Sequence, residues 1–119
     1  MLRVALAPAP AEYPRYPSRE CACCGVRHPV RRRGMRLFHG DALEGDICPD
    51  CVLMGPAGAA AKIRERVESL RKEGDEGGGG SKRISLVRLL SRRARLLDGT
   101  RSFSLAARQA AVRETRERR

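Results

Sequence analysis

The 119-residue sequence contains no Trp and no Asn, and only two Phe and two Tyr. Aromatic side chains usually supply much of a buried core, so a core in this chain must be built from Leu, Val, Ile and Ala. Chains this short and this poor in aromatics commonly need a disulfide or metal staple. The five cysteines are the candidates for that staple.

The sequence also lacks a long apolar run. No stretch approaches the length of a membrane span, and the apolar segment 4–7 before Pro8 is too short for a signal-peptide core. An odd number of cysteines with paired C-x-x-C spacing favours a reducing compartment over a disulfide framework. We therefore expect a cytoplasmic protein with no membrane partner.

Acidic residues are scarce in the last third of the chain. The formal net charge is +11, and residues 77–119 carry twelve Lys and Arg against three Asp and Glu, which gives +9. Coding bias toward Arg would not explain this segregation. A basic segment beside a nearly neutral one usually points to an anionic partner, most often nucleic acid.

Proline and glycine divide the chain into four parts. Four prolines precede Ser18, which predicts an extended N-terminal arm over residues 1–20, packed onto the rest through Tyr13 and Tyr16. Four consecutive glycines predict a flexible linker over residues 74–81, either a natural tether or an engineered fusion linker. This boundary separates residues 21–73 from a tail over residues 82–119 and predicts that the first part folds without the second.

Periodicity predicts a small α+β fold. Residues 36–39 form a strand candidate, and turn formers at Gly40-Asp41 and Gly45-Asp46 predict a β-hairpin before the second cysteine pair. Pro56 suits the first turn of a helix that ends near Gly74. Two more helices are expected in the tail, one carrying an apolar stripe from Ile84 to Leu97 and one from about Ser104 to Glu117.

The cysteines form two pairs with metal-ligand spacing. Cys21 and Cys24 are separated by two residues, as are Cys48 and Cys51. Two such turns supply the four thiolates that tetrahedral Zn²⁺ prefers, so these four residues are the predicted zinc ligands. Cys23 is interpreted as a bystander thiol, because binding one ion from adjacent positions is strained. His28 and His39 are expected to lie on the surface or in the hairpin.

This arrangement resembles the zinc-ribbon and treble-clef group of zinc fingers over residues 21–73. The resemblance implies a first knuckle at Cys21-Ala22-Cys23-Cys24-Gly25, a β-hairpin, and a second knuckle at Cys48-Pro49-Asp50-Cys51 that opens a helix. The chain also looks like small bacterial zinc-ribbon proteins of undefined function. The resemblance implies more about fold than about role.

The pattern favours a binding protein over an enzyme. Some treble clefs are nucleases, whose motif has an acidic residue directly before the His and an Asn further on. In this chain Phe38 stands before His39, and the sequence contains no Asn. A thiol redox role for the second C-x-x-C would need a βαβ fold. A four-thiolate zinc site has no open coordination position. We expect no catalysis and no small-molecule substrate.

Arginines supply the predicted nucleic-acid contacts, mainly to phosphates. A solvated basic turn is the alternative for the first three of them, and a helix-turn-helix is a weaker alternative for residues 104–119. The competing function is an adaptor whose tail helices dock on a larger nucleic-acid-processing protein complex. The candidate contact residues are Arg31, Arg32, Arg33, Arg88, Arg92, Arg93, Arg95, Arg108, Arg113 and Arg116.

Overall fold

A computed structural model of the chain describes residues 2–13, 17–77 and 80–118. Five strands precede three helices. The strands are β1 (Leu2–Pro8), β2 (Ser18–Glu20), β3 (Arg27–Pro29), β4 (Arg33–His39) and β5 (Ala42–Asp46), and the helices are α1 (Pro49–Gly77), α2 (Ser81–Asp98) and α3 (Leu105–Glu117). The predicted α+β class is confirmed at this coarse level.

The main sheet is antiparallel with the order β1-β4-β5. The predicted hairpin is present, and its turn contains Gly40 at φ 62°, a left-handed conformation that glycine adopts without steric cost. The register shifts within the hairpin, since Leu37 pairs with Gly45 while Phe38 pairs with Leu43. Glu44 is therefore the extra residue of a β-bulge, which changes the direction of its backbone and side chain.

Strand β1 corrects the predicted N-terminal arm. Leu2–Pro8 pairs with the whole of β4 as a strand of the main sheet, instead of packing on the surface of the domain as an extended arm. Leu2 and Val4 are buried in the core, and Pro8 ends the strand. The proline-based prediction missed the proline-free alternation of Leu2, Val4 and Leu6, which is the pattern of a half-buried strand.

The outer edge of β1 is covered by the α2–α3 connection. The backbone N–H of Leu2 donates to Thr100 Oγ1 at 3.3 Å, and Ser104 Oγ donates to the Val4 carbonyl at 3.2 Å. Ser104 is also the N-cap of α3, where its side chain accepts from the Ala107 N–H. These contacts join the two ends of the sequence and protect a strand edge that could otherwise pair with another chain.

A buried ion pair joins β4 and β5 of the sheet. Arg36 and Asp46 lie directly across from each other on β4 and β5, with Nε and Oδ1 3.3 Å apart, and Arg36 is only 1% exposed. Arg36 also donates to the carbonyls of Ala7 (2.6 Å) and Arg31 (3.0 Å). Its guanidinium lies over the buried ring of Tyr13. The predicted packing of Tyr13 is therefore present, whereas Tyr16 lies outside the described residues.

Helix α1 consists of two helical segments. Gly55, with φ 79° and ψ 176°, separates the turn that follows Pro49 from the longer helix that starts at Pro56. The helix runs past its predicted end at Gly74 and reaches Gly77. Of the predicted linker, residues 74–77 therefore belong to α1, Ser81 begins α2, and residues 78 and 79 lie outside the described residues.

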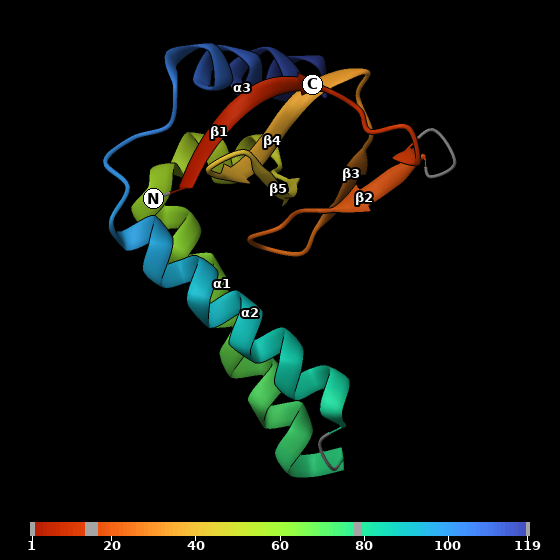
Figure 1. Cartoon of the computed structure of the whole chain (residues 1–119), viewed down its shortest axis with the longest axis vertical. Coiled ribbons are helices and arrows are strands. Elements are labelled where there is room, and N and C mark those ends of the chain that lie inside the picture. Colours follow the sequence, from red (N-terminus) through yellow and green to blue (C-terminus); the bar gives the residue numbers. More distant parts are fainter. Residues whose placement is uncertain (1, 14–16, 78–79, 119) are drawn as a thin grey trace.

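Helices α2 and α3 pack on the rest of the molecule. Figure 1 shows α2 running back along α1 as one arm of a helical hairpin that extends away from the sheet, while α3 lies beside β1 and β4. Leu90, Ala94 and Leu97 of α2 and Ala107, Ala110 and Ala111 of α3 share one buried cluster with the sheet and with α1. The tail is therefore part of the core. None of the described helices is long and apolar enough to cross a membrane.

Candidate metal centre

The first cysteine pair lies in a tight turn between β2 and β3. The Cys21 N–H donates to the Val26 carbonyl (2.8 Å), and the Gly25 N–H donates back to the Cys21 carbonyl (3.0 Å). Gly25 has φ 80°, a conformation that would be strained with a side chain. This knuckle brings the Cys21 and Cys24 sulfurs toward one side of the turn.

The second pair lies at the start of α1. Cys48 directly precedes the helix, and Cys51 stands in its first turn. Residues three apart share a face of a helix, so both sulfurs point in the same direction. The positive end of the helix dipole also favours thiolates at this position.

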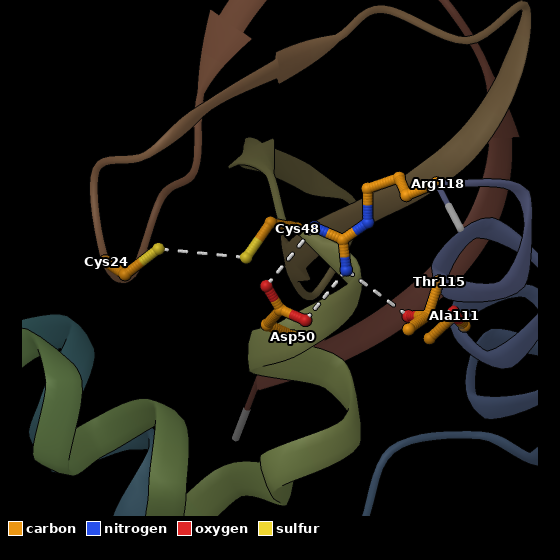
Figure 2. A network of polar contacts seen from close by, with 6 residues as sticks. All are labelled: Cys24, Cys48, Asp50, Ala111, Thr115 and Arg118. Carbon is orange, nitrogen blue, oxygen red and sulfur yellow. Dashed lines mark hydrogen bonds and ion pairs between the residues drawn. The ribbon is translucent and has the colours of Figure 1, made fainter.

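The four sulfurs of Cys21, Cys24, Cys48 and Cys51 lie within 4.8 Å of one another. The Cys21 and Cys51 sulfurs are 3.8 Å apart, and those of Cys24 and Cys48, drawn in Figure 2, are 3.7 Å apart. Four sulfurs at the zinc–sulfur bond length form a tetrahedron whose edge is about 3.8 Å. The four residues therefore fit a metal ion, and their prediction as one cluster is confirmed.

The electrostatics of the cluster centre on Cys21. The backbone N–H groups of Cys23 and Cys48 donate to its sulfur at 3.4 and 3.3 Å. The pKa of Cys21 is lowered chiefly by side-chain hydrogen bonds with Cys23, Cys48 and Cys51. The pKa values of Cys48 and Cys51 are raised, chiefly by their hydrogen bonds to Cys21. A metal ion must displace those protons, so metal binding releases protons.

Cys23, His28 and His39 are not members of the four-cysteine group. Cys23 is buried, and its pKa is raised chiefly by the hydrogen bond of its thiol to Cys21. His28 lies in β3 with its Nε2 buried, and His39 is exposed at the end of β4. Among the described residues, no metal-ligand cluster other than the four cysteines is present.

No family model, curated protein or solved structure gives a significant match to this chain. The residues themselves must therefore carry the functional argument.

The first turn of α1 is also tied to the end of α3. The guanidinium of Arg118 spans Asp50, with Nη2 2.9 Å from Oδ1, and also contacts Thr115 Oγ1 at 3.5 Å (Figure 2). Thr115 in turn donates to the Ala111 carbonyl at 2.8 Å. Asp50 stands between the two cysteines of the second pair, so this network links the metal-ligand cluster to the C-terminal helix.

Three of the predicted nucleic-acid contacts have structural partners instead. Arg93 is 5% exposed and donates through Nη1 to the Ala22 carbonyl (2.6 Å) inside the knuckle, so it cannot reach a phosphate in this structure. Arg92 pairs with the carboxylate of Glu44 at 2.7 Å. Arg31 pairs with Glu114 and Glu117 on α3. The bulge at Glu44 is what places acceptors beside Arg92 and Arg93.

The other seven predicted contacts are exposed, and their side chains make no ion pair or hydrogen bond with a described residue. They lie at the start of β4 and just before it, on α2 and on α3. They are Arg32, Arg33, Arg88, Arg95, Arg108, Arg113 and Arg116. The structure adds two exposed arginines of α1: Arg71, and Arg64, which pairs with Asp98. The sequence did not single them out because residues 55–76 carry five basic and five acidic side chains.

Proposed function

We propose that this chain is a non-catalytic, zinc-stabilised nucleic-acid-binding protein whose metal module is of the treble-clef kind. The knuckle before β3, the β4–β5 hairpin and a helix that starts at the second cysteine pair follow one another in the order expected of a treble clef. Zn²⁺ is the proposed ion, because four thiolates in a tetrahedron suit zinc.

The proposed role is structural because four protein ligands complete the coordination of zinc. No position is left for a water or a substrate, which a catalytic zinc ion needs. The metal would instead fix the knuckle against the first turn of α1. Elemental analysis should find one zinc per chain, whereas an iron-bound chain would be coloured and would overturn the zinc assignment.

The observation that carries nucleic-acid binding is that seven predicted contact arginines are exposed and that their side chains make no ion pair with a described residue. Most of the acidic side chains near α2 and α3 already neutralise other arginines, as Glu44, Asp98 and Glu114 do. The unpaired positive charge is therefore available to an anionic partner. Phosphate contacts dominate the affinity of most nucleic-acid-binding proteins and carry little sequence information.

Salt dependence tests this proposal. The zinc-loaded chain should bind a duplex of about 20 base pairs, and if roughly six arginines reach phosphates, the slope of log K against log salt should be about −5. The absence of measurable affinity at low salt would refute nucleic-acid binding. Treatment of a lysate pull-down with nuclease should release the co-purifying material.

A second candidate function is an adaptor that docks on a protein complex. Its specific support is the exposure of Ile84 (52%) and Leu89 (40%) on α2, and of Leu105 (60%) at the start of α3. Apolar docking depends weakly on ionic strength, so a partner that survives nuclease and high salt would favour this function over the first.

A further inference from the structure

The helical hairpin carries a groove along the seam between α1 and α2, on the side facing away from the knuckle. One hollow of about 550 Å³ is lined by Arg64, Arg71 and Arg95. A second hollow of about 450 Å³ is lined by Arg71 and Arg88. Because Arg71 lines both, the two hollows form one continuous surface, which we call the arginine groove and define by Arg64, Arg71, Arg88 and Arg95.

The four groove residues form two pairs across the seam, Arg64 with Arg95 and Arg71 with Arg88. Arg64 and Arg71 are seven residues apart on α1, as are Arg88 and Arg95 on α2, and seven residues rise about 10.5 Å and return to nearly the same helix face. Arg64 forms an ion pair with Asp98, and Arg83 lies beside Gly74, which fixes the antiparallel register. Arg95 therefore lies near Arg64, and Arg88 lies near Arg71.

The positive charge of the arginine groove is poorly compensated. Arg71, Arg88 and Arg95 are exposed, and their side chains make no ion pair or hydrogen bond with a described residue, whereas Arg64 pairs with Asp98. Glu68 is the acidic residue that lines the groove, and Lys72 approaches it at 3.7 Å. Like charges held this close repel, so an anion bound between them would be favoured.

The opposite side of the same seam differs. There Arg66 pairs with Glu20 at 3.6 Å, while Arg92 and Arg93 bind Glu44 and Ala22 of the knuckle region. One side of the hairpin therefore contacts the knuckle region, and the other side presents Arg71, Arg88 and Arg95 to solvent together with Arg64, which pairs with Asp98. Helices α1 and α2 therefore carry both the contacts to the knuckle region and the arginine groove.

We propose that the arginine groove is the site where the chain binds the phosphodiester backbone of a nucleic acid, an inference that rests on the proposed function. Two arginine pairs about 10.5 Å apart are too far separated for a single phosphate group, so the groove suits a chain of several phosphates. Arginine binds phosphate oxygens in a forked geometry. Leu70, Ile84 and Val87 line the distal end and offer an apolar surface to sugar carbons.

A matched pair of double variants tests this site in the full, zinc-loaded chain. R88Q/R95Q removes two groove arginines, and R108Q/R113Q removes two exposed, unpaired arginines from α3, so both variants lose the same charge from a helix. Binding to a fluorescent 20-base-pair duplex is measured by anisotropy between 50 and 200 mM salt. Zinc content and far-UV helicity should match the parent chain in both variants.

The groove variant should lose about tenfold in affinity near 100 mM salt, and its salt slope should become shallower by about 2. The α3 variant should lose no more than about threefold. Glu68→Gln should strengthen binding, because it removes the negative charge from the groove. Equal or larger losses in the α3 variant would overturn the groove assignment and leave the proposed function standing.

Two further outcomes separate the possible failures. Competition by polyglutamate as effective as competition by unlabelled duplex would overturn a phosphodiester site in favour of an acidic protein partner. A parent chain that binds no duplex at 50 mM salt would overturn both the proposed function and the inference that rests on it.

Discussion

At the scale of single residues, the four metal ligands differ from the fifth cysteine in geometry more than in chemistry. All five are buried or half-buried and close together, but only four converge within 4.8 Å as a metal-ligand set. Cys23 lies next to Cys24 in the knuckle, and its backbone N–H supports the sulfur of Cys21. Its contribution is therefore a hydrogen bond that orients a ligand, which is a typical arrangement around metal sites.

Replacing Cys51 by Ser should remove the metal and unfold the chain. Structural zinc supplies about 10–16 kcal/mol of apparent binding energy in small zinc domains, far more than the net stability of most domains. Elemental analysis and NMR dispersion measure the two effects. Cys23→Ala is the matched control and should keep one metal ion per chain, and its loss of metal would show that the ligand set is wrong.

Arg36 is the residue whose burial is energetically most demanding. Asp46 balances its charge at 3.3 Å without a hydrogen bond from Nε, while Nη1 and Nη2 donate to the carbonyls of Ala7 and Arg31. Buried charges persist only with such compensation. Together these contacts connect β1, β4, β5 and the segment before β4.

Arg36→Ala should destabilise the chain by about 3–5 kcal/mol, because it leaves the carboxylate of Asp46 buried without its partner. Denaturant unfolding measures the change. The double variant R36M/D46L removes both charges and should be more stable than R36A, since an apolar pair can replace a buried ion pair. A double variant that is no more stable than R36A would contradict the role of the uncompensated charge.

At the scale of elements, Arg93 connects α2 to the knuckle. Burial lowers its pKa, although nearby Glu44 and Cys23 favour its charged form. The guanidinium donates to a carbonyl between two cysteines, so α2 restrains the backbone that holds the first ligand pair. Metal retention and helix packing are therefore coupled through one side chain.

Arg93→Ala should lower the free energy of unfolding by about 1–3 kcal/mol, because the Ala22 carbonyl loses its charged donor. It should also hasten loss of the metal to a chelator. Arg95→Ala, two residues along the same helix but exposed and unpaired, should stay within about 0.5 kcal/mol of the parent chain. Equal chelation rates in both variants would show that Arg93 does not restrain the knuckle.

Local patterns predicted the elements that depend on local chemistry. The C-x-x-C turns, the hairpin at Gly40 and the start of α3 near Ser104 each follow from residues within a few positions of one another. Arg93 shows what such patterns miss. Its acceptors at Ala22 and Glu44 are 71 and 49 residues away, and a charge beside the apolar stripe of α2 gave no sign of burial.

The same limit applies to β1 and to the arginine groove. The alternation of Leu2, Val4 and Leu6 was readable as a strand, but its pairing with β4 depends on residues 25 to 37 positions away. Arg71 joins the groove only because α2 folds back along α1 in one register. The four-glycine segment predicted that the part before it and the part after it fold independently. Small and branched side chains from α1, α2 and α3 are instead buried in one cluster.

At the scale of the whole molecule, one core extends over all three helices and the sheet. It includes Leu2 and Val4 at one end of the chain and Ala110 and Ala111 at the other. Ile63 and Val67 of α1 lie along the seam with α2. The metal-ligand cluster therefore anchors one end of a core that the C-terminal helices complete.

A chain truncated after residue 76 should fail to form a stable domain, contrary to the expectation that residues 21–73 fold alone. The truncation would expose the seam faces of Ile63 and Val67, remove Arg93 from the knuckle, and leave the edge of β1 without Thr100 and Ser104. Each exposed large apolar side chain costs about 1.5–3 kcal/mol, so a few of them exceed a typical net stability. Thermal unfolding with zinc present measures this, with the full chain as reference. A truncated chain that keeps one zinc, a dispersed NMR spectrum and a cooperative transition would show instead that the metal module folds independently of α2 and α3.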